Sequence, residues 1–553
     1  MNNSSNRIRT SIFALQAIMV LICLVVLGRI FYLQIVQYEV YDELGDQNSI
    51  RQEYVEAARG LIYDRNGNLL VDNQPIYSVT ITPLNFDDKN IPLLAELLGE
   101  SDSLVTVLVN DAKRYSRFRT SKLISDIDFK AFSLIQENLW QLPGIGHQID
   151  SKRNYPSEMT GSHVFGYLRE ADEKDYKETK SIRLGDKIGK SGLELYYQDN
   201  LKGDLGINYL KVNALGQSLG KFTEEKIEQP PIQGDNLTTT IDADLQAFAE
   251  KLMKGKSGGI VAMNPHTGEI LALVSSPEYE VKKLAGRIDK EYWQFINSDS
   301  TRPLFNRAIS SRQPPGSTFK PLMGIIGLHL GIVTPETEIY NLESAIAHSS
   351  NTYFLNVMDK IATSGKLNTW SRLAKDFGLG VPNQIDLPSA NRGILPDSAY
   401  LDSRFGKNKW GLGDVLQFGI GQGLVSASPL QIAQMTSSIV NGGYKIEPHL
   451  LRAIQRADGS IEQNNRPKEK IDWVKEEYLN AVKKGMRRNV LEGSGRFYAA
   501  IPDIEVAGKT GTAQNPLGFS HGWYTSFAPA DNPEIVVTVF LENAGFASIS
   551  AVP

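Results

Sequence analysis

The sequence predicts an α+β protein with a single N-terminal transmembrane helix, an elongated mixed domain that we call the pedestal, and a C-terminal domain whose sheet is covered by helices. Three observations lead to this prediction. An uncharged and almost wholly apolar segment lies near the N-terminus, and short strand and turn patterns follow it. In the C-terminal half, apolar strand patterns come first, helical patterns follow, and strand patterns return at the end of the chain.

Length and composition narrow the classes of protein. A chain of 553 residues is too long for one ordinary core, so we expect two or three folded units besides any membrane segment. A hydrophobic content of 41% with 22% charged residues is typical of a folded protein. The net charge of −5, without a basic stripe, argues against a nucleic-acid partner. The single cysteine, Cys23, excludes intramolecular disulfides, and the seven histidines lack ligand spacing, so we predict no metal and no cofactor.

Residues 11–36 form the apolar segment, which is long enough to span a bilayer as an uncleaved anchor. A cleaved signal peptide is the alternative, but the apolar run is too long for one and no small-x-small cleavage site follows it. Basic residues precede the segment and acidic residues follow it, namely Arg7, Arg9, Asp42, Glu43 and Asp46. By the positive-inside rule, residues 1–10 are a cytoplasmic tail and the bulk of the chain lies outside the cytoplasmic membrane.

The rest of the chain divides into two predicted domains. The pedestal covers residues 37–235 and contains a helical head insertion at about 84–148. Within it, residues 58–70 are typical of a β-hairpin with an Asn-Gly turn. A turn-rich stretch at 229–235 marks the boundary, and residues 236–553 form the C-terminal domain.

A serine and a lysine lie three residues apart where a buried helix is expected to begin. Ser317 follows Pro314, Pro315 and Gly316, which cannot continue a regular element, whereas residues 321–330 fit a helix. Residues i and i+3 share a helix face, so Lys320 should lie beside the Ser317 hydroxyl and near the free N–H groups of the first turn. The pair is therefore a candidate nucleophile and base.

A lysine accepts a proton only when it is neutral, and its usual pKa is about 10.4. To be half neutral near pH 7, its pKa must fall by roughly 3, which corresponds to about 4 kcal/mol. Burial and a second cation both lower the pKa of a lysine. Lys509 is the candidate for that cation, and Gly511 in the same strand-like run lets a substrate approach the backbone. Ser349 and Asn351 lie between the two lysines in the sequence.

These residues match three short motifs in a fixed order. They read S-x-x-K, S-x-N and K-T-G, the set that marks penicillin-binding proteins and serine β-lactamases. Each motif alone is a weak signal, because S-x-x-K also occurs at 218–221 and K-S-G at 190–192. Further matching runs are Arg59–Gly67, Tyr155-Pro156, Ile188–Glu194, Pro315–Lys320, Gly419–Gly423 and Lys509–Gln514. With these runs the chain resembles the class B penicillin-binding proteins. The runs Asp72–Pro75, Ser350–Phe354 and Ile420–Gly423 resemble their elongation-type branch most.

The resemblance implies a serine β-lactamase/transpeptidase-like C-terminal domain and an activity. The enzyme would be a D,D-transpeptidase that cross-links peptidoglycan stem peptides at their D-Ala-D-Ala ends, and β-lactams would acylate it. Ser317 would attack the penultimate D-Ala carbonyl, Lys320 would take the serine proton, and Ser349 would relay protons to the leaving amine.

The resemblance also implies the substrate contacts and a partner. Asn351 would hold the donor peptide, and the terminal carboxylate would lie against the run Lys509, Thr510, Gly511 and Thr512. The backbone N–H groups of Ser317 and Thr512 would form the oxyanion hole. A membrane glycosyltransferase of the SEDS family would bind the transmembrane helix and the pedestal.

Three alternatives stay open at this point. A division-type transpeptidase has the same motifs. A β-lactamase or carboxypeptidase has the same fold, and residues 476–480 match an E-x-x-L-N pattern associated with deacylation. A non-catalytic scaffold that activates a glycosyltransferase would need the anchor and the pedestal but not the complete serine-lysine set.

Overall fold

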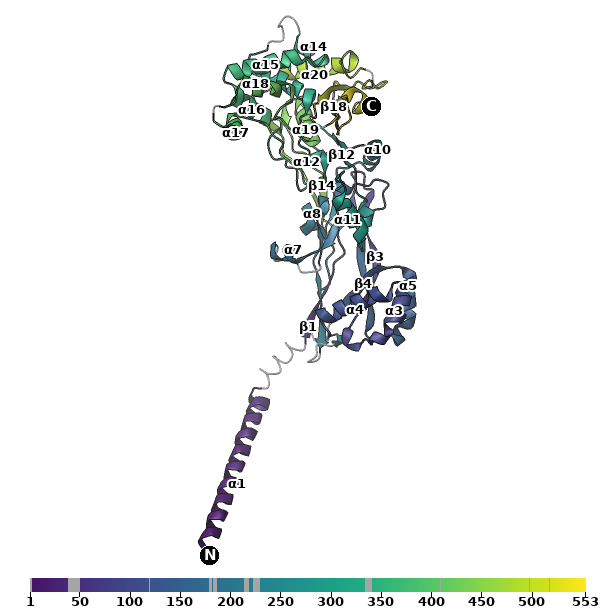
Figure 1. The fold of residues 1–553 in the computed structure, drawn as a ribbon, viewed down its shortest axis with the longest axis vertical. Helices are drawn as coiled ribbons and strands as arrows, with labels where there is room; N and C mark the ends of the chain where they lie inside the picture. Colours follow the sequence, from purple (N-terminus) through teal and green to yellow (C-terminus); the bar gives the residue numbers. More distant parts are fainter. Residues whose placement is uncertain are drawn as a thin grey trace. The chain divides into compact units, whose positions relative to one another are not determined.

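The computed structural model describes residues 2–37, 50–118, 120–178, 182, 186–212, 218–221, 229–333, 341–407, 409–496, 498–516 and 518–553. The chain forms two compact units, which Figure 1 shows as a ribbon. Unit 1 comprises residues 1–57, 77–149 and 204–232, and unit 2 comprises residues 58–76, 150–203 and 233–553. The two units alternate along the sequence. The domain boundaries proposed from the sequence, at 36 and 235, stay predictions.

The apolar segment is helical. Helix α1 covers Asn2–Phe31 and continues into the π-helical turn η1, Tyr32–Val36. Its stretch Leu15–Ile35 is 21 residues long, has a mean hydropathy of 2.4 and buries none of its side chains in the protein. At 1.5 Å per residue it is about 31 Å long, close to the thickness of a bilayer's hydrocarbon core. The prediction of an N-terminal apolar helix long enough to cross a membrane is confirmed.

Unit 1 contains a small antiparallel sheet and a helical part. The sheet has the order β1-β8-β9, from Ile50–Val55, Gly206–Val212 and Ser218–Lys221. The helical part consists of η2 Pro83–Asn85, η3 Asp88–Asn90, α3 Ile91–Leu98, α4 Asp102–Tyr115, β4 Ser121–Ile127, α5 Phe129–Asn138 and η4 Leu139–Gln141. A separate core formed by Val79, Ile81, Leu94, Val105, Leu123 and Ile135 holds it together. The range of about 84–148, for which the sequence predicted helices, therefore contains α3, α4 and α5.

The N-terminal segments of unit 2 pair with strands from much later in the chain. The order is β15-β14-β10-β2-β3, formed by Ile461–Gln463, Leu451–Gln455, Asn236–Thr239, Ile62–Tyr63 and Leu69–Ile81. Strands β2 and β3 are antiparallel, and the Asp64 carboxylate accepts hydrogen bonds from the backbone N–H groups of Asn66 and Asn68 in the turn between them. The predicted hairpin is confirmed. Strand β10 pairs with β2 in parallel, so the chain returns to this hairpin from a distance.

Short elements surround a buried ion cluster in unit 2. They are β5 Ile145–Asn154, α6 Ser162–Phe165, β6 Leu168–Glu170, α7 Glu173–Glu178, β7 Lys187–Gly189, α8 Gly192–Tyr196 and α9 Gln198–Leu201. The fully buried Glu194 carboxylate accepts hydrogen bonds from Arg59 Nε at 2.6 Å and Arg153 Nε at 2.7 Å. Burial raises the pKa of the Glu194 carboxyl, but the charges of Arg153 and Arg59 outweigh burial and hold that pKa below its usual value. The run 188–194 is therefore structural.

The centre of unit 2 is a five-stranded antiparallel sheet with the order β12-β11-β19-β18-β17. Its strands are β11 Gly258–Met263, β12 Ile270–Ser276, β17 Ala507–Ala513, β18 His521–Ala528 and β19 Ile535–Leu541. Every residue of β11 and β12 is buried, because both faces of the sheet are covered. Strand β17 forms one edge of the sheet.

Alternate residues of the sheet enter different cores. Val261 and Met263 of β11 join the main core, whereas Ile260 joins a smaller core with Met253 of α10. The helices and turns of this region are α10 Ala243–Met253, η5 Val281–Leu284, α11 Lys290–Ser298, α12 Arg307–Ser310, η6 Gly316–Phe319, α13 Lys320–His329, α14 Leu342–Ala347, α15 Asn351–Thr363, α16 Leu367–Lys375, α17 Ser398–Phe405, α18 Leu412–Val415, η7 Leu416–Ile420, α19 Pro429–Val440, α20 Glu476–Leu491 and α21 Ala547–Ser550, with the strand pair β13 Tyr444–Lys445 and β16 Glu469–Lys470. The predicted fold class, a sheet covered by helices, is confirmed.

Candidate active site

The candidate nucleophile lies on a tight turn that leads into a buried helix. Ser317 is half-buried in the 3₁₀ turn η6, and α13 begins at Lys320. Gly316 has a φ of +56°, a conformation that favours glycine, and its N–H donates to the Gly421 carbonyl at 2.9 Å. The Thr318 hydroxyl donates to the Pro315 carbonyl at 2.7 Å. These contacts fix the backbone on both sides of Ser317.

Lys320 is fully buried, yet its amino group has three oxygen neighbours. Nζ lies 2.7 Å from the Ser349 carbonyl, 2.6 Å from Asn351 Oδ1 and 3.2 Å from Ser349 Oγ. It also lies 5.7 Å from the centre of the Phe354 ring. The lysine of the first motif is thus in direct contact with the serine and the asparagine of the second, which lie about 30 residues away in the sequence.

Burial lowers the pKa of Lys320 to about 7. Lys509 is also fully buried, and burial, followed by the positive charge of Lys320, lowers the pKa of its amino group well below the usual value. The sequence interpretation gave the second cation a share in lowering the pKa of Lys320. In the structure burial is the first cause of the lowered pKa at both lysines, and the repulsion between the two positive charges adds to it at Lys509.

The second motif owes its position to a strained residue between two helices. Ser349 has a φ of +56°, which is uncommon for a residue other than glycine, and it joins α14 to α15. The Ser350 hydroxyl caps α15 by accepting from the Tyr353 N–H, so Asn351 occupies the first helical position and is exposed. Asn489 of α20 donates from its side chain to the Ala347 carbonyl at 2.6 Å, which secures the end of α14.

The third motif lies on the edge strand β17. Thr510 is buried and Thr512 half-buried, and the Lys509 amino group donates to the Thr510 carbonyl at 2.9 Å. Since β17 pairs only with β18 in its sheet, its outer backbone groups can pair with an extended peptide.

A glycine is needed at position 511 because of contacts within the protein, whether or not a ligand is bound. A Cβ at this position would lie 2.8 Å from the Pro315 carbonyl oxygen and 3.1 Å from the Thr318 N atom. A Cβ on Gly316 would lie 3.0 Å from the Thr512 carbonyl oxygen. The nucleophile turn and β17 are therefore in contact at two glycines, and this contact brings the backbone of Thr512 next to that of Ser317.

Three residues at the site were missed by the sequence interpretation. Gln422 donates from its side chain to the Thr512 carbonyl at 3.2 Å, and the Ser494 and Thr510 hydroxyls are hydrogen bonded. The Ala547 N–H contacts the Thr512 hydroxyl at 3.4 Å. The glycine-rich run 419–423 contained a usable signal for Gln422. Ser494 and Ala547 stand in no motif, so their roles depend on the fold.

The competing motif matches lie elsewhere. Residues 218–221 form β9 in unit 1, whereas Ser317, Ser349 and Lys509 all belong to unit 2. Residues 190–192 lie at the start of α8, beside the Glu194 cluster. Glu476, from the E-x-x-L-N pattern, is exposed at the first position of α20.

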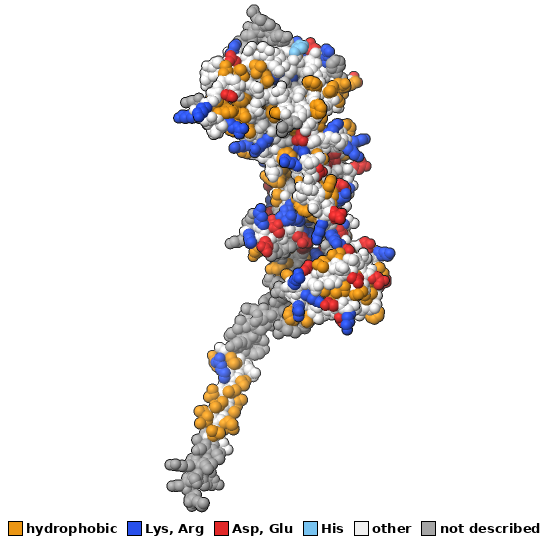
Figure 2. Space-filling view, in the orientation of Figure 1, with side chains coloured by type: hydrophobic (Ala, Val, Ile, Leu, Met, Phe, Trp, Pro, Cys, Tyr) orange, Lys and Arg blue, Asp and Glu red, His pale blue; other side chains and the backbone are white. Residues whose placement is uncertain are grey.

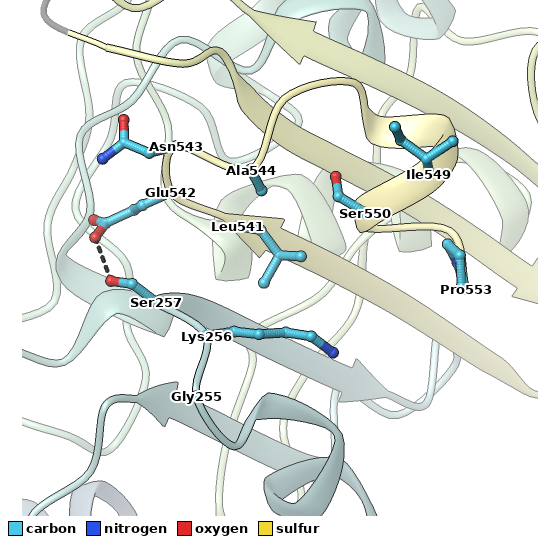
Figure 3. Close-up of a pocket in the computed structure, with 10 residues that line it drawn as sticks. All are labelled: Gly255, Lys256, Ser257, Leu541, Glu542, Asn543, Ala544, Ile549, Ser550 and Pro553. Atoms are coloured by element: carbon cyan, nitrogen blue, oxygen red, sulfur yellow. Dashed lines mark hydrogen bonds between the residues drawn. The ribbon is translucent and has the colours of Figure 1, made fainter.

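A cavity of about 480 Å³ near the last residues of the chain contains none of the predicted site residues (Figure 3). Its polar groups already have partners: Ser257 donates to Glu542 at 2.6 Å, Arg307 donates to the same carboxylate at 3.0 Å, and Lys256 donates to the Leu252 carbonyl at 2.6 Å. Figure 3 shows the Ser257 to Glu542 bond at one side of the cavity and Ile549 at the other. It has no constellation for catalysis.

Two family models match this chain. The model of the penicillin-binding protein transpeptidase domain matches residues 258–552, and that of the penicillin-binding protein dimerisation domain matches residues 54–239. The chain is 31% identical to the peptidoglycan D,D-transpeptidase MrdA of Haemophilus influenzae, over 96% of this chain and 88% of the relative.

Solved structures are similar over nearly the whole chain. A complex of penicillin-binding protein 2 (PBP2) with MreC from Helicobacter pylori superposes with a TM-score of 0.79 at 28% identity, covering 90% of this chain and 97% of that chain. A structure describing the coordination of polymerization and crosslinking by a peptidoglycan synthase complex gives a TM-score of 0.72 at 27% identity, covering 98% and 96% of the two chains.

Proposed function

Because this chain belongs to the penicillin-binding proteins that carry a dimerisation domain and a transpeptidase domain, we propose that it is a peptidoglycan D,D-transpeptidase of the elongation type, like PBP2. It joins stem peptides through a serine acyl-enzyme and is a target of β-lactams. The observation that carries the proposal is the environment of Lys320, a buried lysine with a pKa of about 7 that follows Ser317 by one helical turn.

Ser317 is the proposed nucleophile and Lys320 its base. Neutral Lys320 takes the hydroxyl proton while the Ser317 oxygen bonds to the carbonyl carbon of the penultimate D-Ala. The resulting oxyanion accepts hydrogen bonds from the backbone N–H groups of Ser317 and Thr512, whose chain segments touch at Gly316. The C–N bond then breaks, the terminal D-Ala leaves with a proton, and an ester to Ser317 remains.

Ser349 fits the role of proton relay. Once Lys320 has taken the Ser317 proton, its ammonium group has three N–H donors. These donors suit the Ser349 carbonyl, Asn351 Oδ1 and the Ser349 hydroxyl oxygen at 3.2 Å. A proton can thus pass between Lys320 and the leaving or attacking amine through Ser349. In the second step an amine of another stem attacks the ester and restores the Ser317 hydroxyl.

Edge strand β17 is the proposed platform for the donor peptide. An extended stem peptide pairs with its free edge, opposite the exposed Asn351, and the hydroxyls of Thr510 and Thr512 face the terminal carboxylate. Lys509 adds a buried positive potential beneath that carboxylate when it is protonated. Gly511 permits the approach of the nucleophile turn to the strand.

We further propose that helix α1 anchors the protein in the cytoplasmic membrane with the N-terminus inside, and that α1 and the pedestal bind a SEDS-family glycosyltransferase. The apolar surface of Leu15–Ile35 supports the anchor, and the similar peptidoglycan synthase complex supports the partner. Protease added to the outer face of the membrane should digest the bulk of the chain and spare the residues before α1's apolar stretch. Protection of the bulk would contradict this orientation.

A fluorescent penicillin tests the central assignment. Wild-type protein should form a covalent adduct that Ser317→Ala abolishes, while Ser218→Ala, in the other S-x-x-K match, labels normally. Labelling of Ser317→Ala would refute the assignment of the nucleophile. An adduct hydrolysed within seconds would favour a β-lactamase over a transpeptidase. Rounded cells after depletion support a role in elongation, whereas filaments would indicate division.

A further inference from the structure

A second cavity in unit 2 lies beside the segment that leads into the nucleophile turn. It has a volume of about 430 Å³, and its charged and aromatic lining consists of Arg312, Lys375, Arg392, Asp397 and Tyr400. Two glycines and two aliphatic residues complete the wall: Gly380, Gly393, Ile394 and Leu395. The cavity near the last residues of the chain has its polar groups already paired, but this one does not.

The two arginines supply uncompensated positive charge. Lys375 forms an ion pair with Asp397 at 3.4 Å, which accounts for the carboxylate in the wall. Within the part of the chain that the structure describes, the side chains of Arg312 and Arg392 form no ion pair or hydrogen bond, and both are exposed. A cavity with two free guanidinium groups is suited to an anion.

The surroundings add to this charge. Arg404 of α17 and the following Lys407 and Lys409 are exposed near the cavity residue Tyr400 in the sequence. Figure 2 shows lysine and arginine side chains gathered at the edge of unit 2 where Figure 1 labels α17. The chain as a whole has a net charge of −5, whereas this edge carries a cluster of positive charges. Such a cluster attracts acidic ligands.

Backbone pairing connects the cavity rigidly to the catalytic turn. Residues 426–427 pair on one side with Ile394 and on the other with Gln313: Ser426 and Ile394 exchange two hydrogen bonds of 2.9 Å, and the Ala427 N–H donates to the Gln313 carbonyl at 3.0 Å. Arg312 is next to Gln313 and five residues before Ser317. Even a fully extended chain places their Cα atoms within about 18 Å, the length of a five-residue extended peptide.

We propose that this cavity is an anion subsite, in which Arg312 and Arg392 bind a free carboxylate of the second stem peptide, the one whose amine attacks the acyl-enzyme. The inference rests on the proposed transpeptidase function. Guanidinium groups bind carboxylates through paired N–H donors, and stem peptides carry carboxylates besides the one removed with the terminal D-Ala. The donor stem uses β17, so a distinct basic subsite allows the enzyme to hold two acidic strands at once.

The test compares acceptors of different charge with the full-length protein. A small D-alanyl thioester acylates Ser317, and the acyl group is transferred either to a synthetic stem tripeptide with free carboxylates or to the same tripeptide with its carboxylates amidated. Wild-type protein should use the acidic acceptor about five- to tenfold better, the range of one or two partly exposed charge pairs. The double variant Arg312→Gln/Arg392→Gln should use the two acceptors about equally.

Arg114→Gln is the matched control, because it removes an exposed guanidinium on α4 of unit 1, outside the cavity lining. It should keep the wild-type preference. A double variant that retains the preference refutes the subsite, and so does a wild type that has none. If instead inorganic pyrophosphate inhibits transfer only when Arg312 and Arg392 are present, with no difference between the acceptors, the ligand is a phosphate and the proposal is wrong. If the wild-type protein does not turn over the thioester, the transpeptidase function itself is refuted.

Discussion

The protonation of Lys320 controls the rate of acylation if the proposed mechanism is correct. Its pKa of about 7 is lowered by burial, so its amino group is charged in acid and neutral in mild base. A neutral amine is the active base, and the rate of acylation should therefore rise with pH and level off above pH 8. The difference between this pKa and the usual lysine value of 10.5 corresponds to roughly 5 kcal/mol. This is the free energy by which desolvation disfavours the charged form of the amino group.

The expected profile follows from the fraction of neutral lysine. With a pKa of about 7, that fraction is about 9% at pH 6, 50% at pH 7 and 91% at pH 8. The second-order rate constant for acylation by a fluorescent penicillin should thus increase about fivefold from pH 6 to 7 and about twofold from pH 7 to 8. The measurement is a time course of labelling at each pH with penicillin in excess.

Lys320→Arg is the decisive variant, because a guanidinium stays protonated and cannot accept the serine proton. Its rate of acylation should fall by about 10²–10⁴-fold and lose the rise between pH 6 and 8. Lys221→Arg, in the S-x-x-K match of β9, should behave as wild type. A flat profile for the wild type, or a Lys320→Arg variant that labels at the normal rate, would show that another group is the base.

Two further outcomes follow from contacts in unit 2. Gly511→Ala should lower the free energy of unfolding by about 1–3 kcal/mol and slow acylation at least about tenfold, because the added Cβ meets the Pro315 carbonyl. The control Gly518→Ala, whose added Cβ has its nearest neighbour at 3.4 Å, should change neither stability nor the rate of acylation. Thermal melts and penicillin labelling measure both effects, and a stable, active Gly511→Ala protein would disprove the contact. Glu194→Ala should lower the free energy of unfolding in denaturant by about 3–5 kcal/mol, because it removes the carboxylate that pairs with two buried guanidinium groups. The control Glu477→Ala, which removes an exposed carboxylate, should change the free energy of unfolding by less than about 0.5 kcal/mol. A loss below 1 kcal/mol for Glu194→Ala would mean that the cluster relaxes or takes in water.

The helix and the strand that form the site could be predicted from local sequence patterns. The helix after Ser317 was expected from 321 and begins at Lys320, and the strand-like run that contains Lys509 and Gly511 is β17. Periodicity of side chains and the positions of proline and glycine are local properties, so they predict such elements well. The order of the three motifs then indicated the chemistry, although each motif alone recurs elsewhere in the chain.

Some interpretations were incomplete because the contacts that matter are not local. Gly511 was expected to let a substrate approach the backbone, and the structure adds that a Cβ at this position would meet Pro315 and Thr318. Burial and Lys509 were both expected to lower the pKa of Lys320; burial does lower it, and the charge of Lys320 also lowers the pKa of Lys509. Burial results from packing by distant segments, which no residue spacing reveals.

The sequence by itself determined the N-terminal apolar helix, the hairpin, the helix that follows Ser317 and the residue types of the candidate catalytic set, because each depends on neighbours within a few positions. Tertiary structure alone decided that Lys320 is enclosed by Ser349 and Asn351, that Gln422 and Ser494 support β17, and that Arg312 and Arg392 share a cavity. Those contacts join residues about 16 to 90 positions apart, and they form only when the helices and the sheet pack.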